Sequence, residues 1–240
     1  MQADNLDLRV KVFADGADLP GITALAANSL IRGFTTNPTL MRAAGVADYE
    51  TFAHEVLEVI DGRPISFEVF SDEFEEMERQ AVKIAGWGDN VYVKVPVTNT
   101  RQESSLDLVA ALAAQGVKVN LTALMTPEQV KAAAERLAGG PPSCISVFAG
   151  RIADTGRDPL PIMRESLALI ADEPQIELIW ASPREVLNIF QADAIGCHII
   201  TVTHDLLKKL GNVGRDLEEF SLDTVRMFHR DAEQAGYRLN

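Results

Sequence analysis

The sequence has 240 residues, 47% hydrophobic and 24% charged, which suits one large globular domain or two small ones. Its net charge of −13 repels a phosphate backbone at long range, so we expect no nucleic-acid partner. Its apolar runs are shorter than the roughly 18 residues of a membrane span, and "MQADNLDLRV" is unlike a secretory signal. Cys144 and Cys197 are too few for a disulfide framework. These features favour a cytoplasmic protein without a membrane partner.

Short β-rich runs recur along the chain, each bounded by Gly, Pro, Asp or Asn, as strands usually are. They cover residues 8–14, 33–37, 65–70, 91–97, 117–123, 144–150, 176–182 and 197–203.

Stretches with helical spacing of apolar residues lie between these runs, for example residues 102–116 and 126–140. The second has Thr126 as N-cap, Pro127 at the first helical position and Gln129 for a capping box. The acidic segment 71–80 is interpreted as the solvated face of a helix. Residues 221–240 predict an amphipathic helix that begins at Ser221; its apolar stripe is Leu222, Val225, Phe228 and Ala232.

Eight strand–helix units in 240 residues predict an α/β fold with parallel strands, a single (β/α)8 TIM barrel with an extra C-terminal helix. A doubly wound open sheet is the competing architecture. It is disfavoured because no Gly-rich dinucleotide turn follows any strand. We expect one domain over residues 1–240, and a helix at 221–240 that caps the barrel or docks on a neighbouring subunit.

Alternation along the strands predicts which side chains point into the barrel. In "VYVKVPV" (91–97) the four valines share the outer face, so Lys94 points inward. The same reasoning places Glu68, Asp15, Asn120 and Thr122 inside. All lie near the C-terminal ends of their strands, where the catalytic groups of such barrels sit.

A buried lysine is disfavoured in its charged form, and a neutral amine can attack a carbonyl and form a Schiff base. A neighbouring carboxylate must then move protons. The set Lys94, Glu68 and Asp15 therefore predicts class I aldol chemistry. The alternative is a buried ion pair of Lys94 with Glu68 or Asp15, which by itself adds little net stability. The four histidines show no metal-ligand spacing, so we expect neither a metal nor a cofactor.

The segments "GFTTNPTLM" (33–41) and "VYVKVPVT" (91–98) resemble the transaldolase family, especially its short members, which include fructose-6-phosphate aldolase. The resemblance runs from "VKVFADGAD" to "ADAIGCHIITV". It implies that Lys94 is the Schiff-base nucleophile and Asp15 the acid/base of carbon–carbon cleavage. Glu68 and Thr122 would hold a catalytic water.

The resemblance also implies a site for a sugar phosphate. Asn37 and Asn120 would bind the donor hydroxyls, and Thr35 and Ser146 would line the same pocket. The remaining residues implied are Arg151, Ser182 and Arg184, around the phosphate. An alternative for Arg151 is a surface salt bridge to Asp154 or Asp158.

Two positions separate transfer from simple cleavage within the family. Transaldolases carry Glu and Phe where fructose-6-phosphate aldolase has Gln and Tyr, and here these positions are Glu68 and Phe148. They favour a transaldolase over an aldolase that releases dihydroxyacetone, although Phe148 is also ordinary core material. Trp180 and Pro183 depart from the family pattern and leave the substrate open.

A third hypothesis is a catalytically silent barrel that binds sugar phosphates. By resemblance we expect a homo-oligomer to which residues 221–240 contribute.

Overall fold

The computed structural model describes residues 6–239. Residues 1–5, which form half of the segment compared with a secretory signal, and Asn240, at the end of the expected C-terminal helix, lie outside the described residues.

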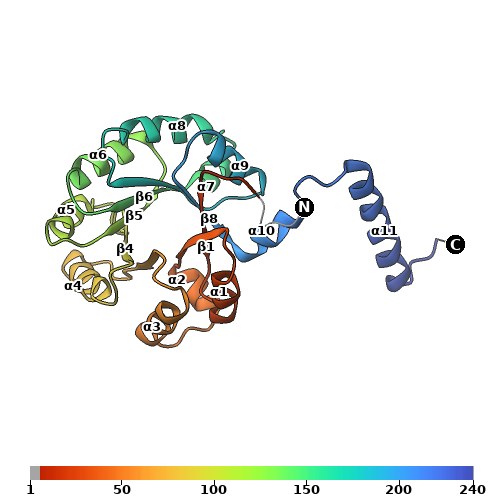
Figure 1. Ribbon diagram of the computed structural model, residues 1–240, viewed down its shortest axis with the longest axis horizontal. Helices are drawn as coiled ribbons and strands as arrows, with labels where there is room; N and C mark the ends of the chain where they lie inside the picture. Colours follow the sequence, from red (N-terminus) through yellow and green to blue (C-terminus); the bar gives the residue numbers. More distant parts are fainter. Residues whose placement is uncertain (1–5, 240) are drawn as a thin grey trace.

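The strands form one closed, parallel barrel in sequence order, so the predicted TIM barrel is confirmed (Figure 1). They are β1 (Lys11–Asp15), β2 (Ile31–Thr35), β3 (Ile65–Glu68), β4 (Val91–Pro96), β5 (Val119–Leu124), β6 (Ser143–Val147), β7 (Ile176–Trp180) and β8 (Ile199–Thr203).

Several predicted strand ends were wrong by a few residues. The run 8–14 becomes a strand only from Lys11, because the amides of Arg9 and Val10 are bonded to the carboxylate of Asp193 instead of to a neighbouring strand. The run 33–37 was placed too late, since Asn37 caps the next helix. The run 144–150 ends at Val147, because Ala149 already opens a helix.

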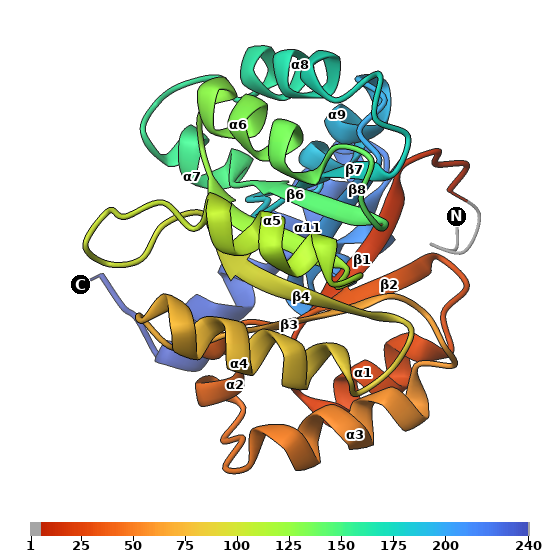
Figure 2. The same ribbon diagram turned by 90° about the vertical axis from the view of Figure 1, so that its left-hand side faces the viewer.

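Helices surround the barrel, and α4, α5 and α6 follow one another outside its strands (Figure 2). They are α1 (Leu19–Ala26), α2 (Pro38–Ala43), α3 (Tyr49–Val59), α4 (Phe74–Ala85), α5 (Leu106–Ala114), α6 (Pro127–Leu137), α7 (Ala149–Asp154), α8 (Leu160–Leu169), α9 (Leu187–Ala194), α10 (His204–Lys208) and α11 (Leu217–Ala235). The predicted capping box of Thr126 and Gln129 is present at the start of α6. None of the helices within residues 6–239 combines the length and hydropathy needed to cross a membrane.

Two separate apolar layers stabilise the barrel. The larger lies between the strands and the helices and contains the β4 residues Val91, Val93 and Val95. The smaller fills the middle of the barrel; its fully or nearly buried members are Phe13, Cys144, Ile179, Ala181 and Ile199. A Cβ on Gly33 would lie 2.5 Å from the ring of Phe13, so β2 needs a glycine beside this inner layer.

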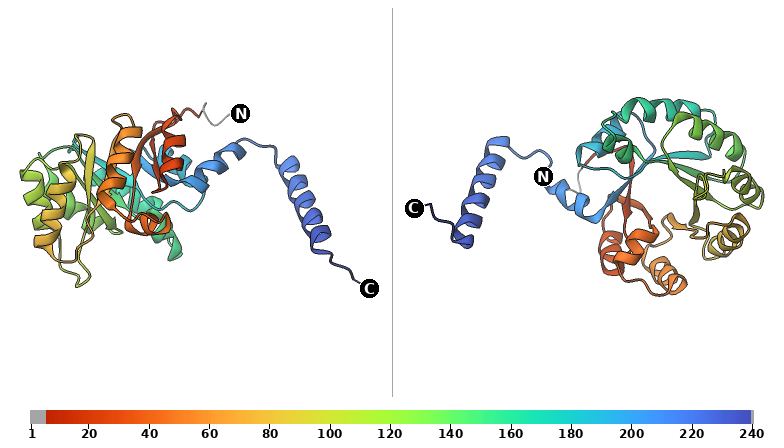
Figure 3. Two further views of the ribbon diagram at one scale, coloured as in Figure 1. Left: turned by 90° about the horizontal axis from the view of Figure 1, so that it is seen from below. Right: turned by 180° about the vertical axis from the view of Figure 1, so that it is seen from behind.

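Helix α11 starts four residues earlier than predicted, at Leu217 rather than Ser221. The reason is Asp216, whose carboxylate accepts hydrogen bonds from the amides of Glu218 and Glu219 and so caps the helix. The helix ends at Gly236, whose φ of 67° is left-handed. It stands away from the barrel, and none of its residues is buried (Figure 3).

Candidate active site

Lys94 lies inside the barrel near the end of β4, with only 7% of its surface exposed. Its neighbour in the sheet register is Glu68 on β3, and Lys94 Nζ lies 3.0 Å from Glu68 Oε2. The ammonium also donates a hydrogen bond to the carbonyl oxygen of Thr36 at 3.2 Å. The buried ion pair considered from the sequence therefore exists, and it brings a proton acceptor directly to the amine.

Asp15 is the last residue of β1 and is paired in register with Thr35 on β2. The Thr35 hydroxyl donates a hydrogen bond to Asp15 Oδ1 at 2.8 Å. Burial raises the pKa of Asp15 above its ordinary value, although the charge of Lys94 and the bond from Thr35 each lower it. A raised pKa makes it easier for this carboxyl group to hold a proton, as a general acid must.

Three polar side chains from different strands form a buried chain of hydrogen bonds. Ser146 on β6 donates to Asn120 Oδ1 at 2.7 Å, and Asn120 Nδ2 donates to the hydroxyl oxygen of Ser66 at 2.9 Å. This chain fixes the orientation of the Asn120 amide.

Thr122 follows on the same inward face of β5, opposite Pro96 in the register. Its buried hydroxyl has no hydrogen-bond partner among residues 6–239. An unpaired buried hydroxyl costs free energy, and the Thr122 hydroxyl is free to bond a group that enters the site. The next residue, Ala123, has a φ of 67°, and the register with β6 shifts between Leu121 and Leu124, so a bulge follows Thr122 in the strand.

Asn37 has a structural task in addition to its predicted one. Its Oδ1 accepts a hydrogen bond from the amide of Leu40 at 3.0 Å and so caps α2, directly before Pro38. The side-chain oxygen is therefore occupied, while the amide nitrogen keeps its donors for another group.

Two predicted phosphate-binding residues contact each other, and the third lies on the adjacent helix α7. Arg184 Nη1 donates to the Ser182 hydroxyl at 3.0 Å, and Arg184 Nε donates to Asp154 Oδ1 at 2.9 Å. Arg151 is exposed and lies over the ring of Phe148, 5.6 Å from its centre. Asp154, one of the two alternative partners of Arg151, is bonded to Arg184 instead, and Arg151 forms no ion pair with the other, Asp158.

The loop that carries Ser182 is in close backbone contact with α7. A Cβ on Gly150 would lie 1.5 Å from the carbonyl oxygen of Ser182. Ser182 itself has a φ of 60°, a strained value for a residue other than glycine. These two features hold the α7 residues next to the Ser182–Arg184 loop.

Trp180 does not reach the predicted sugar site. It is fully buried in the layer between barrel and helices, with its indole nitrogen unpaired within the described chain. Its bulk therefore affects helix packing and not the interior of the barrel, where Ile179 and Ala181 point instead.

Sequence reasoning missed several groups around the site. Thr201 is hydrogen-bonded to Thr35, and alternation along β8 could have placed it inside. The Tyr49 hydroxyl donates to the carbonyl oxygen of Glu68 at 2.9 Å from a helix on the outside, which no local pattern indicates. Within residues 6–239 there is no cluster of three His, Cys, Asp or Glu side chains arranged to hold a metal.

A comparison with known protein families identifies the family of this chain. The family model described as "Transaldolase/Fructose-6-phosphate aldolase" matches residues 12–239. The chain belongs to this transaldolase/aldolase family. It is therefore an enzyme of the transaldolase/aldolase type.

Curated relatives of this chain are described as probable transaldolases. A "Probable transaldolase" from Thermoanaerobacter sp. (strain X514) is 32% identical over 231 residues, which cover 96% of this chain and 100% of the relative. A "Probable transaldolase" from Streptococcus equi subsp. zooepidemicus is 35% identical over 202 residues, covering 84% and 90%. Among solved structures, dihydrodipicolinate synthase from Rhodopseudomonas palustris matches with a TM-score of 0.57 and 14% identity, covering 93% of this chain and 80% of that one. That likeness concerns the fold alone.

Proposed function

We propose that the protein is a transaldolase that moves a dihydroxyacetone unit from a ketose phosphate to an aldose phosphate. The observation that carries the proposal is the buried Lys94 amine, 3.0 Å from the Glu68 carboxylate. The unpaired hydroxyl of Thr122 and the raised pKa of Asp15 support it.

The reaction starts when Lys94, after giving up a proton, attacks the ketone carbon of the donor. The carbinolamine loses water to form an iminium, and a water held between Glu68 and Thr122 carries the proton to the departing oxygen. Asp15 then takes the proton of the hydroxyl β to the imine carbon. The carbon–carbon bond breaks, its electrons pass into the iminium to give an enamine, and the aldehyde leaves. The acceptor aldehyde reverses these steps, and water returns to release the new ketose.

The phosphate end of the sugar would bind at Arg184 and Arg151. Paired guanidinium groups give a phosphate several charge-assisted hydrogen bonds, which offset the repulsion of an acidic surface. Because Asp154 is bonded to Arg184 in this structure, the phosphate must displace that carboxylate or share the guanidinium with it.

The nearest alternative is an aldolase that releases free dihydroxyacetone. Phe148 argues against it, because a phenyl ring has no hydroxyl to protonate the enamine. The enamine therefore persists until an acceptor arrives. Rapid multiple turnover of free dihydroxyacetone from donor alone would instead favour the aldolase.

The test is borohydride trapping with fructose 6-phosphate as donor. We expect one irreversible adduct, located at Lys94 by peptide mass spectrometry, and loss of both adduct and transfer activity in Lys94→Met. Lys83→Met is the matched control, since Lys83 lies on the surface and pairs with Glu50. An adduct on another lysine, or activity in Lys94→Met, would refute the mechanism. Saturable sugar-phosphate binding with no adduct would instead support the hypothesis of a catalytically silent barrel that binds sugar phosphates.

We further propose that the chain works as a homo-oligomer held together by α11. The support is that α11 leaves apolar side chains such as Val225 and Phe228 exposed, at 58% and 63%. An exposed apolar stripe of this kind is typical of an interface.

A further inference from the structure

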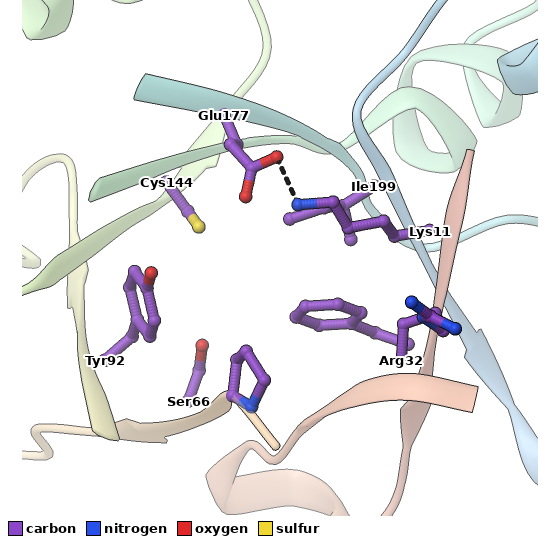
Figure 4. A pocket seen from close by; sticks show the side chains of 9 residues that line it. Lys11, Arg32, Ser66, Tyr92, Cys144, Glu177 and Ile199 are labelled. Carbon is purple, nitrogen blue, oxygen red and sulfur yellow. Dashed lines mark hydrogen bonds and ion pairs between the residues drawn. The ribbon is translucent and has the colours of Figure 1, made fainter. Parts of the chain in front are cut away.

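The opposite mouth of the barrel, at the N-terminal ends of the strands, contains a cavity of about 210 Å³ (Figure 4). Its wall includes Lys11, Arg32, Tyr92 and Glu177, each the first or second residue of its strand. In barrels of this kind that end is usually packed for stability, and the chemistry lies at the other mouth. A hollow lined by charged and hydroxyl groups is therefore unexpected here.

Positive charge is in excess at the rim of the cavity. Lys11 Nζ lies 2.7 Å from Glu177 Oε1, so these two charges compensate each other. Arg32 is exposed and has neither an ion pair nor a side-chain hydrogen bond to any residue from 6 to 239. The Arg32 guanidinium, uncompensated within the described residues, and the Lys11 ammonium, which has spare donors, thus face the same opening in a protein whose net charge is −13.

The inner wall offers hydroxyl groups beside apolar surface. The Tyr92 hydroxyl has no partner among the described residues, and burial raises the pKa of Tyr92, so it stays a neutral donor. The Ser66 oxygen accepts from Asn120, which leaves the Ser66 hydrogen to be donated. Phe13 and Ile199 supply the apolar part.

The two mouths are separate sites. The cavity is lined by Phe13, Cys144 and Ile199 of the inner apolar cluster, and Lys94, Glu68 and Asp15 are not among its lining residues. A ligand in the cavity therefore does not compete directly for the Lys94 amine. Ser66 is the nearest connection, through its hydrogen bond with Asn120.

We propose that this N-terminal mouth is a second binding site, which takes a small organic acid. Arg32 and Lys11 bind the carboxylate, the short carbon chain lies against Phe13 and Ile199, and a hydroxyl of the ligand bonds to Tyr92. Carboxylates are suitable partners for an arginine fork. The volume is below the roughly 300–1,000 Å³ of sites for drug-sized ligands, which excludes nucleotides. The apolar inner wall favours a molecule with a carbon skeleton over free phosphate.

The experiment is calorimetric titration of the full chain with L-malate, succinate and inorganic phosphate. We expect saturable binding of malate, a Kd at least tenfold higher in Arg32→Gln, and a smaller rise in Tyr92→Phe. Succinate, which lacks the hydroxyl, binds more weakly and is indifferent to Tyr92→Phe. Arg184→Gln, at the other mouth, serves as the matched control and leaves malate binding unchanged. The circular dichroism spectrum and melting temperature of Arg32→Gln match those of the wild type, which shows that this variant is folded.

Three results would overturn the proposal. They are no saturable heat with either acid, binding that is lost in Arg184→Gln but kept in Arg32→Gln, and binding of phosphate without binding of the acids. Because the readout is binding at Arg32, its failure says nothing about a Schiff base at Lys94, and the two proposals fail separately.

Discussion

The two charges of Lys94 and Glu68 are both largely withdrawn from water, and desolvation offsets much of their mutual attraction. A pair of this type contributes little to folding, but it holds the amine against a base in a fixed geometry. Asp15 is also withdrawn from water, and its burial raises its pKa and so penalises its ionised state. Under the proposed function, these residues serve catalysis at some cost in stability.

Asp15→Asn is expected to lower turnover by at least about 100-fold while raising the melting temperature at pH 7.5. Ionisation of Asp15 is penalised only in the folded state. The wild type therefore loses stability as pH rises from roughly 4 through the raised pKa, and the variant does not. The advantage of the variant should vanish as the pH is lowered towards 4, as measured by thermal melts across this range.

The control for this prediction is Asp172→Asn, an exposed carboxylate with no bonded partner in the described part of the chain. It should change neither activity nor the pH profile. A destabilised Asp15→Asn at neutral pH would contradict the prediction.

Thr122→Val removes a hydroxyl that has no partner in the protein and keeps the shape of the side chain. The variant should be as stable as the wild type, or more stable by about 1–2 kcal/mol, because an unpaired buried hydroxyl is costly. Turnover should fall at least about tenfold if the hydroxyl positions a water. Chemical denaturation and steady-state kinetics measure the two effects.

Thr36→Val is the matched comparison, since its hydroxyl donates to the carbonyl oxygen of Ser66 at 3.0 Å. It should lose about 1 kcal/mol of stability. Equal losses in both variants would mean that Thr122 also has a structural partner.

At the scale of elements, the junction between α7 and the Ser182 loop decides how the residues proposed to bind the phosphate are placed. Gly150 packs on the backbone of Ser182, and Arg184 is bonded to both Ser182 and Asp154. The helix and the loop therefore move as one unit, which keeps the guanidinium at a constant place relative to the barrel.

Gly150→Ala should cost more than about 4 kcal/mol or prevent folding, because its Cβ would overlap a backbone oxygen that cannot move aside. Gly211→Ala is the matched control, since no atom lies within 4 Å of a Cβ there. It should change the free energy of unfolding by less than about 0.5 kcal/mol. Urea unfolding of both proteins provides the measurement; near-equal midpoints would show that the loop yields.

Strand alternation was sufficient to predict the inward set on β3, β4 and β5, because those strands alternate regularly over the residues concerned. It could not predict where strands begin and end, since that depends on partners remote in sequence. An example is Asp193, which accepts the hydrogen bond of the Val10 amide just before β1 begins. Long-range contacts like that between Tyr49 and the end of β3 leave no periodic signal. Likewise, the pattern of β2 does not reveal Gly33, which is required by the ring of Phe13.

On the scale of the whole molecule, the barrel and α11 differ in where their apolar side chains lie. The barrel buries its own apolar residues, whereas α11 offers an apolar face to something outside it. The alternation of strands and helices in the sequence predicted the buried core of the barrel. The exposed position of α11 depends on the direction that the chain takes after residue 213, which residue spacing does not predict.

Deletion of residues 214–240 should leave the barrel folded, because α11 contributes no buried side chain to it. The truncated protein should sediment as a monomer, and the full chain as an oligomer. Phe228→Asp in the full chain should also dissociate the oligomer, since it charges the apolar face. Arg230→Gln on the same helix is the control and should not. Analytical ultracentrifugation decides this; a monomeric full chain would exclude the role proposed for α11.

Lys94 is a single buried amine, so under the proposed reaction it carries only one sugar fragment at a time. The aldehyde cut from the first sugar must therefore leave before the second sugar can react with the fragment on the lysine. Donor and acceptor thus bind in alternation, and the enzyme cycles between a free and a loaded lysine.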